Sequence, residues 1–122
     1  MKYYNTLEQG CIQNRLNTEI LGKHLRIFSA VTSTNEEAKQ LPADEIEEGL
    51  VLVASSQAGG RGRFGRKWIS PVGGLWFSVI LKPQNVVPTP LTVIFGGALS
   101  QVLEDLTGLP VVFHWPNDLF ID

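Results

Sequence analysis

The sequence predicts one mixed α/β (α+β) domain in which helices and short strands alternate. Residues 50–56 and 74–82 are short apolar runs, as in strands that are buried on both faces. Residues 91–106 instead gather apolar side chains on one face of a helix. With 122 residues, of which 43% are hydrophobic and 18% charged, the chain also has the size and composition of one ordinary soluble domain.

Two elements are expected before residue 32. Spaced apolar residues over 5–22 predict a helix. Residues 24–31 alternate between apolar and polar side chains, which predicts a strand with Leu25 and Ile27 on one face.

A second helix should follow this strand directly. Ser33 and Glu36 fit the capping-box pattern, which predicts a helix that starts one or two residues after the serine. Pro42 should end this helix, because proline cannot continue it. An acidic connector then leads to the strand over 50–56 and, after a long loop, to the strand over 74–82.

The second half of the chain contains the clearest predicted helix. A turn-rich linker, residues 83–90, leads into it. Thr89 suits an N-cap, Pro90 suits the first helical position, and Gly108 should end the helix. Two strands, "VVFHW" and "LFID", then surround a Pro-Asn-Asp turn. The apolar stripe of the helix comprises Leu91, Ile94, Phe95, Ala98, Leu99, Val102, Leu103 and Leu106.

The loop at residues 57–73 concentrates positive charge. Four of the ten Lys and Arg residues lie within it: Arg61, Arg63, Arg66 and Lys67. The glycines between them allow close approach to a ligand, and arginine binds carboxylates and phosphates through paired N–H groups. The composition favours an anionic ligand, with a mobile solvated loop and an Arg-Gly nucleic-acid segment as alternatives. The net charge of −2 argues against nucleic acid.

This loop and two other segments resemble signature motifs of the biotin protein ligases. "GRGRFGRKW" matches the family pattern Gly-Arg-Gly-Arg-x-Gly-Arg-x-Trp. "TSTNEEA" resembles the Ser-Thr-Asn turn that opens a helix near the biotin ring, and "HWPNDLFI" resembles the Trp-Pro-Asn-Asp turn before the catalytic lysine. The three motifs follow the family's order across residues 32–121. The Arg-Arg-x-Ser-Gly-Gly-Gly segment of the related lipoate ligases and octanoyltransferases is not found.

The resemblance implies a fold and an activity. The fold would be that of biotin and lipoate ligases, a mixed sheet flanked by helices similar to class II aminoacyl-tRNA synthetases. The activity would be ATP-dependent conversion of biotin to biotinyl-5′-AMP, then transfer to a lysine of a biotin carboxyl carrier domain of a carboxylase. ATP, biotin and Mg²⁺ would be the cofactors. The alternative is a truncated or degenerate relative that binds biotin or a similar acid without turnover.

The resemblance also implies roles for individual residues. Those expected to bind biotin are Ser33, Thr34, Asn35, Gln57, Gly60, Arg61, Gly62 and Arg63. Those expected at the adenylate are Arg63, Arg66, Trp68, Asn117 and Asp118. Arg61 and Arg63 would be catalytic, because guanidinium groups can stabilise the charge that develops on the α-phosphoryl group. No metal ligand is assigned, since one carboxylate does not define a Mg²⁺ site.

Several of these residues also have ordinary structural interpretations. Ser33 fits a plain N-cap, Trp68 a hydrophobic anchor, and the Asn-Asp pair a simple turn. Trp76 and Phe77 are expected in the core, and Glu104 on a solvated helix face.

The resemblance further implies which part of a ligase residues 1–122 represent. The catalytic lysine is expected beyond Asp122, together with the C-terminal part of the catalytic domain. About 30 residues precede the Ser-Thr-Asn turn, too few for an N-terminal DNA-binding domain. We expect a partial catalytic domain, completed by a homodimer or a second chain, with neither DNA nor membrane as partner. A single cysteine fits a reducing cytoplasm.

Overall fold

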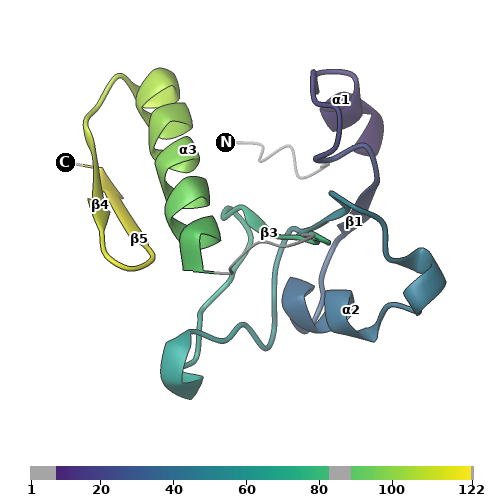
Figure 1. The fold of residues 1–122 in the computed structure, drawn as a ribbon. Helices are drawn as coiled ribbons and strands as arrows, with labels where there is room; N and C mark the ends of the chain where they lie inside the picture. Colours follow the sequence, from purple (N-terminus) through teal and green to yellow (C-terminus); the bar gives the residue numbers. More distant parts are fainter. Residues whose placement is uncertain (1–7, 83–88, 122) are drawn as a thin grey trace. The chain divides into compact units, whose positions relative to one another are not determined.

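A computed structural model describes residues 8–82 and 89–121, which form two compact units. The first unit ends at Lys82 and the second begins at Pro83. Figure 1 labels the elements of both along the chain. The expected linker at 83–90 lies mostly outside the described residues. Within the described ranges, no helix combines the length and the apolar character that crossing a membrane requires.

The first unit is built on a three-stranded mixed sheet. Its strands are β1 (Leu25–Phe28), β2 (Val51–Ala54) and β3 (Trp76–Val79), in the order β1-β2-β3. The pair β1–β2 is parallel and the pair β2–β3 is antiparallel. Leu52 and Ala54 are fully buried and Val53 is 5% exposed, so β2 is covered on both faces as expected. Each strand is shorter than the apolar run that predicted it.

The connection between the two parallel strands is helical. It contains α2 (Thr34–Gln40) and a single 3₁₀ turn, η1 (Ala43–Glu45), and α2 packs on β2 and β3. The helix ends where Leu41 turns extended ahead of Pro42, as predicted. The helix begins at Thr34 with Ser33 at the N-cap, as the capping-box pattern predicted, but the Ser33 side chain makes no capping hydrogen bond.

The N-terminal helix is much shorter than the sequence predicts. Only α1 (Gln9–Gln13) is helical, residues 14–22 form turns and bends, and residues 5–7 lie outside the described part. The Thr18 hydroxyl donates to the Leu21 carbonyl, and Gly22 has a positive φ of 78°. Such local side-chain bonds compete with helix formation. The apolar spacing over this stretch therefore did not signal a long helix.

Phe77 corrects the prediction that both aromatic residues of β3 belong to the core. The neighbouring Ser78 faces α2, where it bonds Thr34 and Asn35. Side chains alternate along a strand, so Phe77 faces the opposite side of the sheet, and it is 44% exposed. Trp76 is half-buried, and its indole N–H donates to the Pro71 carbonyl at 2.9 Å.

The second unit is a helix packed on a β-hairpin. It contains α3 (Thr89–Thr107), β4 (Val111–His114) and β5 (Asp118–Ile121), and the two strands pair antiparallel as predicted. Gly108 ends the helix with a φ of 68°, and its N–H bonds the Glu104 carbonyl at 2.8 Å.

The hairpin covers a different face of α3 from the predicted apolar stripe. A Cβ added at Gly96 would lie 2.5 Å from the Phe113 ring, so the helix meets the hairpin at this glycine. Within the stripe, Ile94 and Leu106 are 62% and 77% exposed. Glu104 is half-buried instead of fully solvated, because its carboxylate accepts the Val111 N–H at 3.0 Å.

Candidate functional site

The residues predicted around the biotin head group meet just beyond the ends of β1 and β2. Past these strands the two chain segments continue side by side. Val31 donates its N–H to the Ser56 carbonyl at 3.3 Å and accepts the Ala58 N–H at 3.0 Å. This pairing places Gln57 beside the start of α2. Two segments that are far apart in the sequence therefore form one site.

Gln57 is held at both ends of its carboxamide. Its Oε1 accepts the Thr34 backbone N–H at 2.8 Å and the Thr34 hydroxyl at 3.2 Å. Its Nε2 donates to Ser70 Oγ at 3.0 Å. Thr34 and Ser70 are 4% and 3% exposed, so these bonds lie in the interior. The first free N–H of α2 is thus capped by a glutamine from another segment, and Ser33 contributes no capping bond.

Two serines that the sequence analysis missed complete this network. Ser78 Oγ lies 2.8 Å from Thr34 Oγ1 and donates to Asn35 Oδ1, also at 2.8 Å. Ser70 bonds Gln57, as described above. Ser78 could have been found, because it is the one polar residue within the apolar stretch "LWFSVIL", and a hydroxyl in such a strand needs a partner. Ser70 carries no comparable signal.

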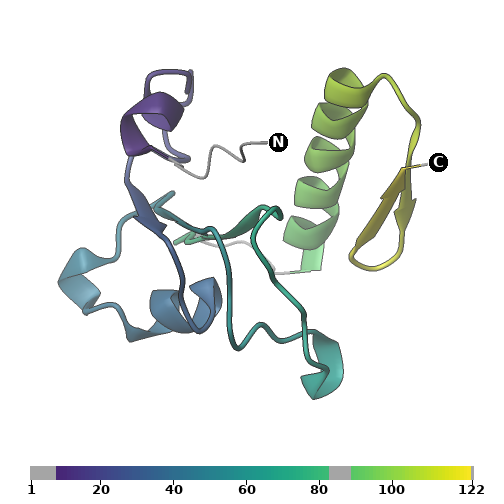
Figure 2. The ribbon, with the colours of Figure 1, turned by 180° about the vertical axis from the view of Figure 1, so that it is seen from behind.

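The arginine-rich loop is an ordered ribbon whose two sides pair with each other. Backbone bonds join Gln57 N–H to Ser70 O at 2.9 Å, Trp68 N–H to Gly60 O at 2.8 Å, and Gly62 N–H to Arg66 O at 2.8 Å. We call residues 57–60 and 68–70 the loop base. The loop tip is the turn η2 (Arg63–Gly65), which lies at the far end of the loop from the sheet in both views (Figures 1 and 2).

Glycine is required at two points of the loop, for different reasons. Gly60 is buried, and an added Cβ would lie 2.6 Å from the Trp68 carbonyl oxygen and 2.8 Å from Ser70 Oγ. Gly65, at the tip, has a φ of 75°. The close approach at Gly60 is therefore between the two sides of the loop itself.

The four cationic side chains of the loop are exposed. Within the described part of the chain, no ion pair involves Arg61, Arg66 or Lys67. The Arg63 guanidinium lies 5.3 Å from the Phe64 ring centroid, and Phe64 is 86% exposed at the tip. Trp68 is 51% exposed, so it is not a buried anchor. Among the described residues, Arg61, Arg66 and Lys67 therefore present positive charge that no ion pair neutralises.

Asn117 and Asp118 belong to the second unit, whereas the other predicted residues belong to the first. They lie at the hairpin turn, where Asn117 Nδ2 donates to Asp118 Oδ1 at 3.3 Å and both side chains are exposed. In the described ranges, no cluster of three or more His, Cys, Asp or Glu residues could hold a metal ion.

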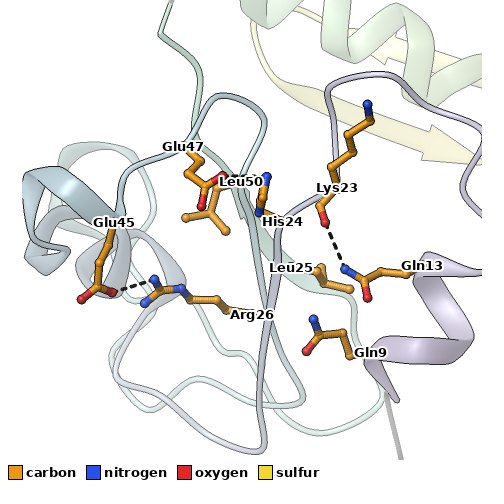
Figure 3. A pocket seen from close by; sticks show the side chains of 9 residues that line it. All are labelled: Gln9, Gln13, Lys23, His24, Leu25, Arg26, Glu45, Glu47 and Leu50. Atoms are coloured by element: carbon orange, nitrogen blue, oxygen red, sulfur yellow. Dashed lines mark hydrogen bonds and ion pairs between the residues drawn. The ribbon is translucent and has the colours of Figure 1, made fainter.

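A separate pocket of about 240 Å³ lies between α1, β1 and the connector before β2 (Figure 3). His24 Nε2 lies 2.6 Å from a Glu47 carboxylate oxygen, and Arg26 donates to Glu45 at 2.7 Å. Figure 3 shows that both pairs form between residues lining the pocket, so most of the charged side chains there are paired with each other. None of its lining residues is a predicted site residue.

Comparison with known proteins shows which family the chain resembles. The model of the biotin/lipoate A/B protein ligase family matches residues 27–122. The bifunctional ligase/repressor BirA of Bacillus subtilis is 37% identical over 119 residues, which are 95% of this chain and 37% of that protein. The biotin–[acetyl-CoA-carboxylase] ligase of Paracoccus denitrificans is 33% identical over 102 residues, 79% of this chain and 41% of that protein.

A solved structure is similar as well. The biotin protein ligase from Aquifex aeolicus in complex with biotin and ATP is 39% identical, with a TM-score of 0.73 over 80% of this chain and 41% of that one. This likeness confirms the expected fold class. The chain spans about two-fifths of the length of these relatives. With the family model covering most of its length, the chain belongs to the biotin/lipoate A/B protein ligase family.

Proposed function

We propose that these residues form the acid-binding part of a biotin protein ligase. The reaction would convert biotin and ATP to biotinyl-5′-AMP and pyrophosphate, and then transfer biotin to a lysine of a carboxylase carrier domain. The observation that carries this proposal is the buried network around Gln57, placed directly at the base of a loop with exposed arginines. One end suits a neutral polar head group and the other an anion.

The network offers both kinds of hydrogen-bonding group that a cyclic urea needs. The ureido head of biotin has one carbonyl acceptor and two N–H donors. The hydroxyls of Ser33 and Thr34 and the amides of Asn35 and Gln57 can donate and accept. These four residues, with the backbone around Gly60, are proposed to hold the head group. The buried positions of Ser33 and Thr34 support this role, since a ligand there would be shielded from water.

The loop arginines are proposed to act where the two anionic substrates meet. In the first step a biotin carboxylate oxygen attacks the α-phosphorus of ATP, and pyrophosphate leaves. Negative charge then builds on the α-phosphoryl oxygens, which the guanidinium groups of Arg61 and Arg63 would stabilise. In the second step the carrier lysine amine attacks the acyl carbon, and AMP leaves. The absence of ion pairs at Arg61 among the described residues supports its availability.

The nucleotide end is proposed to involve Arg66, Trp68, Asn117 and Asp118. Arg66 and Trp68 are exposed on the returning side of the loop. Asp118 is a lone carboxylate in its unit's turn, and the described residues do not fit a resident metal site. Mg²⁺ would therefore arrive with the nucleotide substrate, and no residue is assigned to it.

The test is biotin-dependent exchange of pyrophosphate into ATP by the complete gene product that contains these residues. Exchange is expected only when biotin is present. Arg61→Ala should lower the rate by about 10²-fold or more, because it removes charge stabilisation from the transition state. Arg15→Ala, which removes another exposed arginine outside the loop, is the matched control and should leave the rate unchanged.

Two outcomes would overturn this proposal. Exchange that another carboxylic acid supports and biotin does not would assign a different substrate. Biotin binding by titration calorimetry without any exchange would support the non-catalytic relative instead.

A further inference from the structure

Ser70 connects the head-group site to the returning side of the arginine loop. Its hydroxyl accepts a hydrogen bond from Gln57 Nε2 at 3.0 Å and donates one to the Trp68 carbonyl at 3.3 Å. Its backbone carbonyl accepts the Gln57 N–H at 2.9 Å. With 3% exposure, Ser70 makes these bonds away from solvent.

These bonds fix which way the Gln57 carboxamide faces. A carboxamide can rotate by half a turn with little change in shape, and only its bonding partners distinguish oxygen from nitrogen. At one end the Thr34 backbone N–H can only donate, so Oε1 must face it. At the other end the Trp68 carbonyl can only accept, so the Ser70 hydroxyl gives its proton there and must accept from Nε2.

The geometry leaves little freedom for this group to shift. A Cβ at Gly60 would lie 2.8 Å from Ser70 Oγ and 3.3 Å from Gln57 Nε2, so the backbone there is already in close contact with both. One N–H of Nε2 is bound to Ser70. The second N–H has no partner among the described residues and remains for a ligand or for water.

We propose that Ser70 is a positioning residue for the acid substrate. It holds Gln57 so that the free amide N–H is presented to the carbonyl acceptor of a cyclic urea head group, and it fastens that amide to the returning side of the loop. This inference rests on the proposed function, because it assumes that the head group lies at Gln57.

The test measures KM for biotin, KM for ATP and kcat in pyrophosphate exchange with the complete gene product. Ser70→Ala should raise KM for biotin about tenfold, the effect of losing one buried hydrogen-bond partner. KM for ATP should stay within about twofold. Ser56→Ala is the matched control, since the Ser56 hydroxyl beside Gln57 bonds the Ser29 carbonyl instead.

A double-mutant cycle separates positioning from a general structural effect. In a Gln57→Ala background, Ser70→Ala should change KM for biotin by less than about twofold, because Ser70 affects biotin binding only through the Gln57 side chain. Full additivity of the two substitutions, or equal rises in KM for both substrates, would refute the inference. If Ser70→Ala does not fold, Ser70→Cys keeps the volume while weakening both bonds, and the same cycle applies.

Failure of the proposed function looks different. In that case the unmodified protein shows no biotin-dependent exchange. Refutation of the role of Ser70 requires an active unmodified protein in which the cycle is additive.

Discussion

Gly60→Ala tests whether the loop base is as closely packed as the structure indicates. The new Cβ would lie 2.6 Å from the Trp68 carbonyl oxygen, whereas ordinary contact begins at 3.4 Å. The backbone on one side of the loop must therefore move by about 0.8 Å. Overpacking of this kind costs about 1–3 kcal/mol. Loss of the Trp68 N–H to Gly60 O bond would add about 1 kcal/mol.

Urea unfolding of the complete gene product measures this loss, with fluorescence and circular dichroism as probes. We expect the free energy of unfolding to fall by about 2–4 kcal/mol. Gly62→Ala is the control in the same loop. Its Cβ would lie 3.4 Å from the nearest atom and its φ is −87°, so its effect should stay within about 0.5 kcal/mol. Equal stability of the two variants would show that the loop base is not packed as described.

Substitutions at three further interactions are measured by thermal or urea unfolding. Ser78→Ala removes a hydroxyl that bonds two polar neighbours and should cost about 1–3 kcal/mol, whereas a neutral result would mean that those neighbours bond water equally well. Glu104→Ala removes the acceptor of the Val111 N–H and should cost about 1 kcal/mol, while Glu104→Gln, which retains an acceptor oxygen, should cost less. The coupling between Arg26 and Glu45 in a double-mutant cycle should be below about 1 kcal/mol and should weaken with salt, because both side chains are substantially exposed. A larger coupling energy that does not fall with added salt would show that the Arg26–Glu45 pair is not a weak, solvent-screened ion pair.

Local patterns predicted the order of helices and strands well. The apolar run at residues 50–56 indicated β2, and the Pro-Asn-Asp turn indicated the hairpin of the second unit. These signals are local. A short run of apolar residues is enough to indicate a strand that is buried on both faces, and a few turn residues are enough to indicate a turn. The end of α2 before Pro42 and the end of α3 at Gly108 were predictable for the same reason.

Features decided by partners distant in sequence were not predictable in this way. The Ser-x-x-Glu pattern suggested a capping box, yet the Ser33 side chain makes no capping hydrogen bond, and the Thr34 N–H in the first turn bonds the distant Gln57 carboxamide. The apolar stripe of α3 showed which face is hydrophobic, but periodicity does not show which face a neighbour covers. The hairpin packs at Gly96, where the small residue allows close approach.

The candidate site likewise contains residues that the sequence motifs predicted and one that only the fold revealed. Its motifs identified Thr34 and Gln57, which the fold brings within hydrogen-bonding distance. Ser70 entered the site only because the loop folds back on itself and pairs across residues 57–70. That pairing depends on the fold of the whole loop, so no short sequence pattern around Ser70 predicts its contact with Gln57.

The division of the arginine loop into a base and a tip bears on how such a site can evolve. In the base, Gly60 and Ser70 are buried, the two sides of the loop are paired, and Gln57 is bonded to α2, so a change there disturbs several groups together. The tip, Arg63–Gly65, is exposed and joined to the base through the ribbon. Under the proposed function, substitutions at the tip would therefore alter how charge meets the nucleotide while the head-group contacts keep their geometry. One continuous motif thus contains two regions on which selection can act separately.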